Sequence, residues 1–288
     1  MQPDATSKEI TIKLPHMTLR GLEWGNPEGK PVLGLHGWLD NAASFDGLGP
    51  YLSEFRFVAL DWSGHGRSDH RPYGAMYHFI EWAPELFDAA DALGWETFSI
   101  VGHSMGAGAA TLAASAVPER IERMVLIDGM GPLTTEPSDA PELLGRAIQE
   151  RKKHLSRTPK AYVDLEAAIA QRMKSFPLSE ESARRIVKRG TKQTDEGLVF
   201  TFAPMLRGTS LVRLTEPQVL SYLSQITSPT LLIRATQSFL VGNDFVEKRI
   251  QQSSAIQSIT VEGSHHVHLD QPEVLGDKVL AFLRGESL

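Results

Sequence analysis

Short apolar runs recur through the first half of the chain, and turn-forming residues bound each of them. Four of these runs lie at 32–35, 57–60, 98–101 and 124–127. They are separated by about 25 to 40 residues, which is the length that a strand, a loop and a crossover helix require. We therefore expect an α/β fold with a mostly parallel central sheet flanked by helices.

Further strand patterns occur near both ends of the chain. The segments 9–14 and 19–24 alternate apolar and polar residues, which predicts an antiparallel edge to the sheet. Strand-like runs return at 230–233 and 258–261, and a final helix is expected at 272–284. We therefore expect these later segments to add strands to the same sheet, after a long segment without strands.

The intervening segment spans residues 132–222, where the sequence is charged and helical in pattern and lacks strand-like runs. We expect a helical cap, or lid, inserted between two parts of a core domain, 1–131 and 223–288. Its helices should begin near Pro141, Pro159 and Ser179, and Gly190 should end the third.

Composition excludes several classes of chemistry. The 288 residues are 41% apolar and 22% charged with a net charge of -6, which is ordinary for a globular protein. The absence of cysteine rules out disulfides, thiolate catalysis and cysteine-based metal sites. The densest basic run, 151–154, follows Glu150 and fits a solvated helix face, so we expect no nucleic-acid partner. Sequence alone does not indicate the oligomeric state.

We expect neither export nor membrane insertion of this chain. Residues 1–12 carry Asp4, Lys8 and Glu9 and contain no apolar segment of signal-peptide length, so a cytoplasmic location is expected. The least polar stretch, 99–117, includes His103 and many small residues, which favours a packed helix over a stable membrane insertion.

A Gly-His-Ser-Met-Gly sequence at 102–106 fits the pattern G-x-S-x-G, between an apolar strand and a helix of small residues. A sharp, strained turn at this point brings the backbone close together, and a Cβ at Gly102 or Gly106 would collide with it. The turn should lift Ser104 clear of the sheet at the start of a helix whose dipole favours negative charge. Ser104 is thus the predicted nucleophile.

The segment 35–38, Leu-His-Gly-Trp, ends an earlier strand and supplies a second part of the site. A tight turn here can aim the backbone N–H of Trp38 at a substrate oxygen, beside the N–H of Met105, to form an oxyanion hole. The Trp38 indole should then line the substrate pocket, and His103 is a further predicted substrate-binding residue. We interpret His36 as a packed structural histidine.

A serine hydroxyl needs a general base, and adjacent histidines follow the last strand. Where a serine stands in a G-x-S-x-G turn between strand and helix, the histidine of the triad comes last in the chain, so His265 and His266 are both candidates. The acid that orients the base is either Asp128, which directly follows a strand, or Asp244, which lies about ten residues beyond Ile233. We favour Asp128 because the acid must be held rigidly.

Three segments carry a resemblance to a known family. These are His-Gly-Trp-Leu-Asp-Asn at 36–41, Asp-Trp-Ser-Gly-His-Gly-Arg-Ser at 61–68, and the motif at 102–106. Together they resemble α/β-hydrolases close to the serine hydrolase-like protein family, over nearly the whole chain. Aligning the family's tail pattern His-x-x-His-Leu-x-x-Pro backwards from Pro272 implies that His265 is the base, whereas counting from the preceding glycine implies His266. We interpret Asp61, Gly64, Gly66 and Ser68 as shaping a turn beside the site.

These residues predict an esterase that cleaves a small carboxylic ester through a Ser-His-Asp triad, with no cofactor and no metal. A carbon-carbon bond hydrolase or a lactonase would use the same triad. An alternative of a different class is a non-catalytic ligand-binding protein on a hydrolase scaffold. The apolar segment 198–206 should line the pocket through Phe200 and Phe202, or else join the cap to the core.

Overall fold

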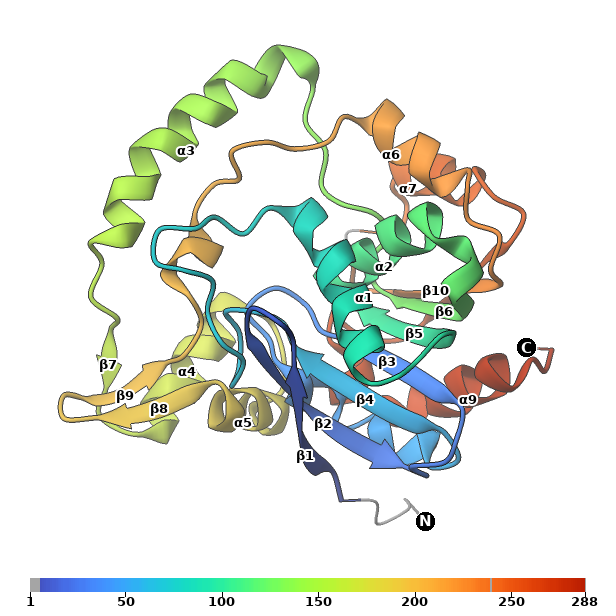
Figure 1. Ribbon diagram of the computed structural model, residues 1–288, viewed down its shortest axis with the longest axis horizontal. Helices are drawn as coiled ribbons and strands as arrows, with labels where there is room; N and C mark the ends of the chain where they lie inside the picture. The colour runs from blue at the N-terminus through green and yellow to red at the C-terminus, as the bar shows by residue number, and fades with distance from the viewer. Residues whose placement is uncertain (1–5, 239, 288) are drawn as a thin grey trace.

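The structure is a computed structural model that describes residues 6–238 and 240–287. An eight-stranded sheet forms its centre, with the strand order β1-β2-β4-β3-β5-β6-β10-β11 (Figure 1). The strands are β1 Lys8–Lys13, β2 Thr18–Gly25, β3 Pro31–Leu35, β4 Arg56–Asp61, β5 Phe98–His103, β6 Ile121–Ile127, β10 Thr230–Ala235 and β11 Ile256–Val261. The pairings from β4 to β11 are parallel, whereas β1 and β2 pair antiparallel, as predicted.

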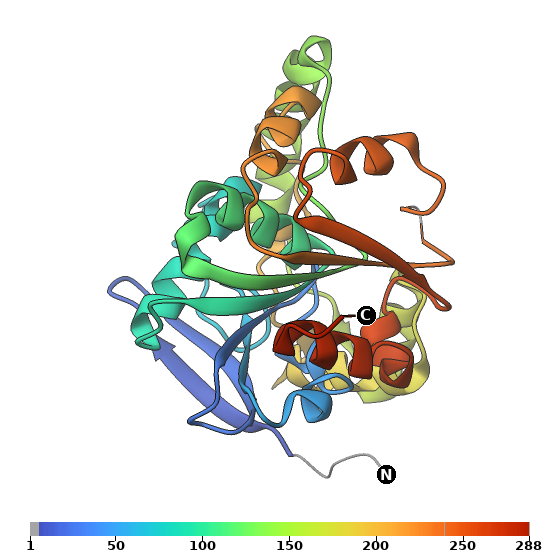
Figure 2. The ribbon, with the colours of Figure 1, turned by 90° about the vertical axis from the view of Figure 1, so that its right-hand side faces the viewer.

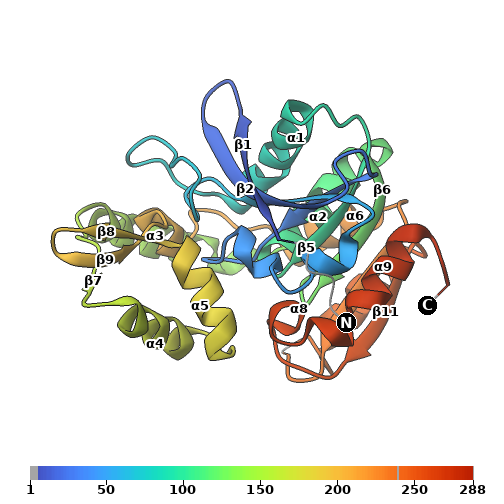
Figure 3. The same ribbon diagram turned by 90° about the horizontal axis from the view of Figure 1, so that it is seen from below.

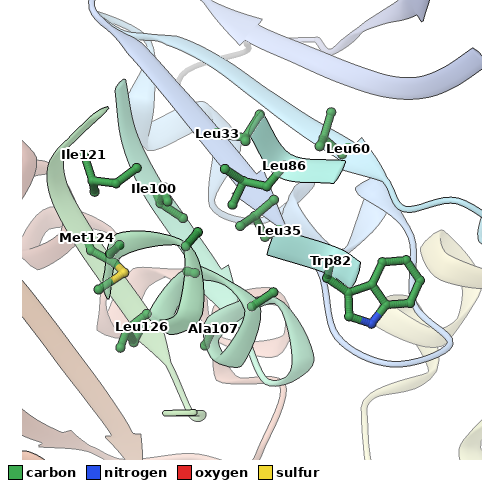
Figure 4. Close-up of a cluster of buried hydrophobic side chains, with 14 of the residues drawn as sticks. Leu33, Leu35, Leu60, Trp82, Leu86, Ile100, Ala107, Ile121, Met124 and Leu126 are labelled. Atoms are coloured by element: carbon green, nitrogen blue, oxygen red, sulfur yellow. The ribbon is translucent and has the colours of Figure 1, made fainter. Parts of the chain in front are cut away.

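The central strands are buried on both faces, which explains why their sequences are continuous apolar runs. Every residue of β5 is buried, and its side chains alternate between two apolar clusters. Ile100 packs in the cluster under α1 Trp82–Ala92 and α2 Met105–Ala116 (Figure 4). Val101 faces the opposite cluster, which includes side chains of α9 Gly276–Arg284. Figures 2 and 3 show these helices on the two faces of the sheet.

The core domain is completed by short helices that follow the later strands. Helix α6 Glu216–Leu223 leads into β10, and α7 Asp244–Ile250 connects β10 to β11. A single turn, α8 Val267–Asp270, follows β11. The predicted final helix is divided into a 3-10 turn, Pro272–Val274, and α9.

The segment between β6 and α6 contains α3 Ala140–Leu155, α4 Leu165–Ser175 and α5 Glu180–Arg189. It also contains a three-stranded antiparallel sheet, so the expectation of a purely helical cap was wrong. The strands are β7 Ala161–Tyr162, β8 Thr191–Thr194 and β9 Gly197–Phe200. β7 has two residues and β8 is polar, so neither shows a strand pattern. β9 begins the apolar segment 198–206, which was interpreted as a pocket wall or as a joint between cap and core and not as a strand. Figure 3 shows this sheet beside α4 and α5, away from the central sheet.

The starts of the cap helices follow their capping residues. The Ser179 side chain accepts a hydrogen bond from the Ser182 amide, so α5 begins where predicted, and Gly190 ends it. Helix α4 begins later than the predicted Pro159. The Asp164 side chain caps it by accepting from the Ala167 amide, and β7 occupies the preceding residues.

Two buried ion pairs attach the cap to the core. Arg172 of α4 pairs with Asp40, and the Nε of Arg189 of α5 lies 2.9 Å from the Oδ1 of Asp61. The Asn41 side chain also donates to the Ile186 carbonyl oxygen, at 2.8 Å. Removing one member of such a pair would leave an unpaired buried charge, which is strongly destabilising. The two ion pairs therefore hold α4 and α5 against the core. Within the described ranges, 6–238 and 240–287, no helix is both long and apolar enough to cross a membrane.

Candidate active site

The site lies where several parallel strands end at the same edge of the sheet. Trp38 follows β3 by three residues, Ser104 directly follows β5, and Asp128 directly follows β6. His265 lies in the loop after β11. Parallel strands present their carboxyl ends to one crevice, which is the usual ligand site of an open α/β sheet. The fold therefore gathers four residues that are far apart in sequence.

Ser104 occupies a strained turn between β5 and α2. Its φ of 51° and ψ of -112° are unfavourable for a residue with a side chain. The turn depends on the two flanking glycines. A Cβ on Gly106 would lie 2.0 Å from the Leu35 carbonyl oxygen, and a Cβ on Gly102 would lie 2.8 Å from the Ala107 backbone. The Ser104 side chain is held at the head of α2 and remains partly exposed.

The loop after β3 packs directly against this turn. A Cβ on Gly37 would lie 3.2 Å from the Ser104 Cβ and 2.9 Å from His103 Nδ1, so only glycine fits. Trp38 follows this glycine, and Met105 is the first residue of α2. Backbone N–H groups at the head of a helix have no partner within the helix. The segments that carry the Trp38 and Met105 amides thus flank Ser104, as an oxyanion hole requires.

Asp128 and His265 are joined by a short contact. The Nδ1 of His265 lies 2.5 Å from the Oδ2 of Asp128. The other oxygen, Oδ1, accepts a hydrogen bond from the Ala235 amide at 3.1 Å, and the Asp128 amide donates to the Ile233 carbonyl oxygen at 2.8 Å. The end of β10 therefore fixes the carboxylate. The Asp128 side chain is fully buried, whereas that of His265 is 27% exposed.

The competing candidates occupy different surroundings. His266 is buried, and its Nε2 lies 3.2 Å from the Oδ2 of Asp40. Asp244 is the exposed first residue of α7. The geometry thus pairs His265 with Asp128 at the sheet edge where Ser104 also lies, whereas His266 belongs to a second, buried cluster.

Trp38 lies at the boundary between core and cap. Its side chain is 39% exposed, and its Nε1 donates to the Leu206 carbonyl oxygen at 2.8 Å. Its ring meets Phe176 edge to face, with 5.9 Å between the ring centroids. Phe176 directly follows α4 and was not singled out from the sequence, because a lone aromatic after a cap helix carries no pattern. The cap residues beside Trp38 are therefore Phe176 and Leu206.

The contacts of Phe200 and Phe202 bear on the two interpretations of segment 198–206. Their rings stack on one another with centroids 5.5 Å apart, and Phe200 also meets Tyr162 of β7. Phe202 packs against the main apolar cluster of the core. Ala203, in the same segment, donates its amide hydrogen to the Gly64 carbonyl oxygen at 2.8 Å. These contacts favour the other reading of the segment, in which it joins the cap to the core.

The segment 61–68 forms the turn that was expected beside the site. Gly64 and Gly66 have positive φ angles of 73° and 51°. The Asp61 carboxylate accepts from the amides of Ala42 at 2.7 Å and Arg67 at 2.8 Å. Asp61 also binds Arg189 of the cap, so this turn serves as a docking point for α5.

His103 is fully buried, so its side chain has no surface that a substrate can contact, and the prediction that it binds substrate gains no support. It lies beside three other buried polar residues, Asp40, His266 and His268. Burial lowers the pKa of His103 well below its ordinary value and lowers the pKa of His268 to about 3.

Asp40 remains ionised within this cluster. Burial raises the pKa of Asp40, but Arg172 and His266 outweigh that effect and hold the pKa below its ordinary value. Asp40, His103 and His266 each offer an oxygen or nitrogen atom within 4.8 Å of the others, so these three residues could hold a metal ion.

Residues 30–272 match the model of the α/β-hydrolase fold family. The chain belongs to this family. The hydrolase is 34% identical to a serine hydrolase-like protein of Danio rerio, in a match that covers 98% of this chain and 90% of that one. It is 30% identical to serine hydrolase-like protein 2 of Homo sapiens, over 96% and 94% of the two chains. The family resemblance predicted from the sequence is confirmed.

Solved structures agree with this placement. A hypothetical protein from Pseudomonas aeruginosa is 38% identical to the hydrolase, with a TM-score of 0.89 and coverage of 96% of each chain. The thioesterase domain from the curacin biosynthetic pathway is 24% identical, with a TM-score of 0.83 and coverage of 96% and 99%, and it shows the fold alone. The family supports hydrolysis by a serine nucleophile, and the chemical class of the substrate is a separate question.

Proposed function

We propose that this protein is a carboxylic ester hydrolase that works through a covalent acyl-enzyme. The observation that carries the proposal is the Asp128–His265 pair, which lies at the same edge of the sheet as the strained Ser104 turn. Ester hydrolysis requires a nucleophile, a base with an orienting acid, and donors for the oxyanion. The chain offers a residue for each of these roles.

In the proposed first half-reaction, His265 removes the proton from Ser104 Oγ as this oxygen attacks the ester carbonyl carbon. The carbonyl oxygen gains negative charge, which the Trp38 and Met105 amides stabilise. The tetrahedral intermediate then collapses, and the C–O bond to the alcohol breaks. His265 returns its proton to the departing alcohol, leaving an acyl group on Ser104.

In the second half-reaction, water attacks the acyl-enzyme and loses a proton to His265. The second tetrahedral intermediate releases the carboxylic acid, and the proton returns to Ser104 Oγ. Throughout the cycle, Asp128 holds the imidazole in one tautomer and stabilises the imidazolium that forms twice. This role requires a rigid carboxylate, and the hydrogen bond from the Ala235 amide supplies rigidity.

Trp38, Phe176 and Leu206 form the proposed wall of the acyl pocket, since they lie together beside the Gly37 loop. Phe200 and Phe202 serve instead to join the cap to the core. A cytoplasmic location and a small-molecule ester as substrate stay predictions from the sequence.

The proposal is tested with a panel of aryl esters of increasing acyl chain length, together with lactones and a substrate cleaved at a carbon-carbon bond. We expect kcat/KM to be highest for an ester, and the Ser104→Ala variant to lose this activity. If kcat/KM is highest for a lactone or for the carbon-carbon substrate, the triad assignment stands, but ester hydrolysis is not the main reaction. A folded protein that hydrolyses nothing and does not react with a fluorophosphonate would support the non-catalytic binding alternative.

A further inference from the structure

A second cluster of ionisable groups lies next to the catalytic loop and takes no part in the proposed reaction. Asp40, His103 and His266 have side chains that are 1%, 1% and 3% exposed. The Oδ2 of Asp40 lies 3.2 Å from His266 Nε2 and 3.7 Å from His103 Nδ1. Buried groups of this kind need partners, because an unpaired polar atom in a protein interior is unfavourable.

The hydrogen bonding of His103 determines which of its nitrogens carries hydrogen. Its Nε2 lies 2.9 Å from the backbone carbonyl oxygen of His265, which can only accept, so Nε2 carries the hydrogen. A histidine that binds a metal ion does so in its neutral form. A neutral imidazole has one N–H group, so Nδ1 presents a lone pair.

This lone pair faces the carboxylate of Asp40. Among the described residues, His103 Nδ1 is buried and has no hydrogen-bond partner. Two electron-rich atoms therefore face one another at 3.7 Å, which is unfavourable unless positive charge lies between them. A cation placed there would be attracted by both atoms.

The donor set and its spacing fit a transition-metal ion. Imidazole nitrogen and carboxylate oxygen bind zinc at about 2.0 to 2.2 Å, which in a tetrahedral site separates neighbouring donors by roughly 3.3 Å. The separations of the two histidine nitrogens from Asp40 Oδ2, 3.2 and 3.7 Å, are close to this value, and all three donor atoms lie within 4.8 Å of one another. Histidines that bind metals usually donate their other N–H to a carbonyl or carboxylate, as His103 does to His265.

The cap supplies a competing positive charge. Arg172 of α4 binds the other oxygen of Asp40, and its guanidinium lies 4.2 Å from the centroid of the Phe176 ring. Arg172 already neutralises the charge of Asp40, so a divalent ion at the cluster would be repelled by the guanidinium. We propose that Asp40, His103 and His266 form a binding site for a divalent transition-metal ion of the zinc class, and that Arg172 competes with this ion for Asp40. The site is distinct from the proposed catalytic cycle, which needs no metal.

The test is titration of the purified full-length protein with Co²⁺, followed by its visible absorption and by displacement with Zn²⁺. We expect one ion per chain with an absorption typical of a tetrahedral or five-coordinate site. His266→Gln should weaken binding by about tenfold or more, because it removes a ligand. Arg172→Met should tighten binding by about tenfold or more, because it removes the nearest positive charge while keeping an apolar stem beside Phe176.

Two further variants separate this proposal from its rivals. Arg189→Met is the matched control for Arg172→Met, because Arg189 is a buried cap arginine that pairs with Asp61 instead of Asp40. It should leave Co²⁺ affinity unchanged. His265→Ala should also leave it unchanged, since His265 is not a proposed ligand. If His266→Gln does not fold, as judged by circular dichroism, Asp40→Asn combined with Arg172→Met should abolish the tight binding seen with Arg172→Met alone.

Three results would overturn the inference. One is the absence of saturable Co²⁺ binding to both the native protein and Arg172→Met. Another is binding that is lost in His265→Ala but kept in His266→Gln, which would assign the ion to the Asp128–His265 pair. The last is equal tightening by Arg172→Met and Arg189→Met, which would mean that a loosened cap, and not competition for Asp40, controls binding. None of these results depends on esterase activity.

Discussion

The carboxylate of Asp128 lies 2.5 Å from the imidazole of His265, although 137 residues separate them in the chain. The sheet order explains the contact, because β10 lies between β6 and β11 and binds Asp128 at its end. Asp128 has a positive φ of 49°, so the chain accepts local strain to turn this carboxylate toward the histidine. The cap segment follows β6 in the chain, yet Asp128 and His265 still contact one another.

We predict that Asp128 orients the base and that Asp244 does not. Asp128→Asn should lower kcat by about 10⁴, because an amide cannot stabilise the imidazolium and favours the wrong tautomer. Asp244→Asn, the matched control on the exposed start of α7, should retain nearly full activity. Steady-state kinetics on one aryl ester measures both. A large loss in Asp244→Asn with little effect in Asp128→Asn would make Asp128 a structural residue.

His265 and His266 should differ sharply despite being neighbours. His265→Ala should be nearly inactive, because it removes the proposed base. His266→Gln should retain most activity, because the side chain of His266 contacts Asp40 in the buried cluster. Activity should be compared in protein whose folding has been verified by circular dichroism. The reverse pattern would place the base one residue later.

Phe176 should influence substrate choice, because its ring lies against Trp38. Phe176→Ala should enlarge the pocket and shift the preferred acyl chain length, with kcat/KM measured across a series of esters. Phe200→Ala is the comparison, since Phe200 packs within the cap against Tyr162 and Phe202. We expect it to lower the free energy of unfolding by about 1 to 3 kcal/mol with unchanged chain-length preference. If Phe200→Ala changes the chain-length preference and Phe176→Ala does not, then Phe200, and not Phe176, lines the pocket.

The buried histidines should make the protein less stable in mild acid. Burial lowers the pKa of His268 to about 3, whereas the histidine pKa in an unfolded chain is near 6.5. Between these pH values the unfolded chain binds a proton that the native protein does not. The free energy of unfolding should therefore be greatest above pH 6.5 and decrease as the pH falls toward 3.

Urea denaturation at several pH values measures this dependence. His268→Gln removes one titrating group while keeping a polar partner for Ser44, whose Oγ lies 2.9 Å from His268 Nε2. This variant should therefore show a shallower decrease in stability with falling pH. A slope equal to that of the native protein would show that His268 does not contribute to it.

Much of the core could be predicted from the sequence because its strands are buried on both faces. Such strands appear as continuous apolar runs, and the runs at 57–60 and 98–101 coincide with β4 and β5. The Ser104 turn was predictable for a similar reason, since its glycines are required by close backbone contacts. Asp128 could be proposed as the acid because it directly follows a strand.

The cap and the buried cluster were harder to predict because they depend on contacts between distant segments. The strands β7 to β9 are too short to show a period, so the cap was expected to be helical. Phe176 and Arg172 lie at or near the end of a charged helix, and nothing in that pattern indicates that they pack against Trp38 and Asp40. His103 was predicted to bind substrate, but it is the last residue of β5 and is buried.

The central claim is that Ser104 is the activated nucleophile of an ester hydrolase. Its most direct test is reaction with a fluorophosphonate, which modifies only a serine made nucleophilic by a nearby base, followed by mass spectrometry of the labelled peptides. We predict one label per chain, located at Ser104, with labelling and ester hydrolysis lost together in a folded Ser104→Ala variant. A folded native protein that is not labelled, or an Ser104→Ala variant that still hydrolyses esters at the native rate, would contradict the claim.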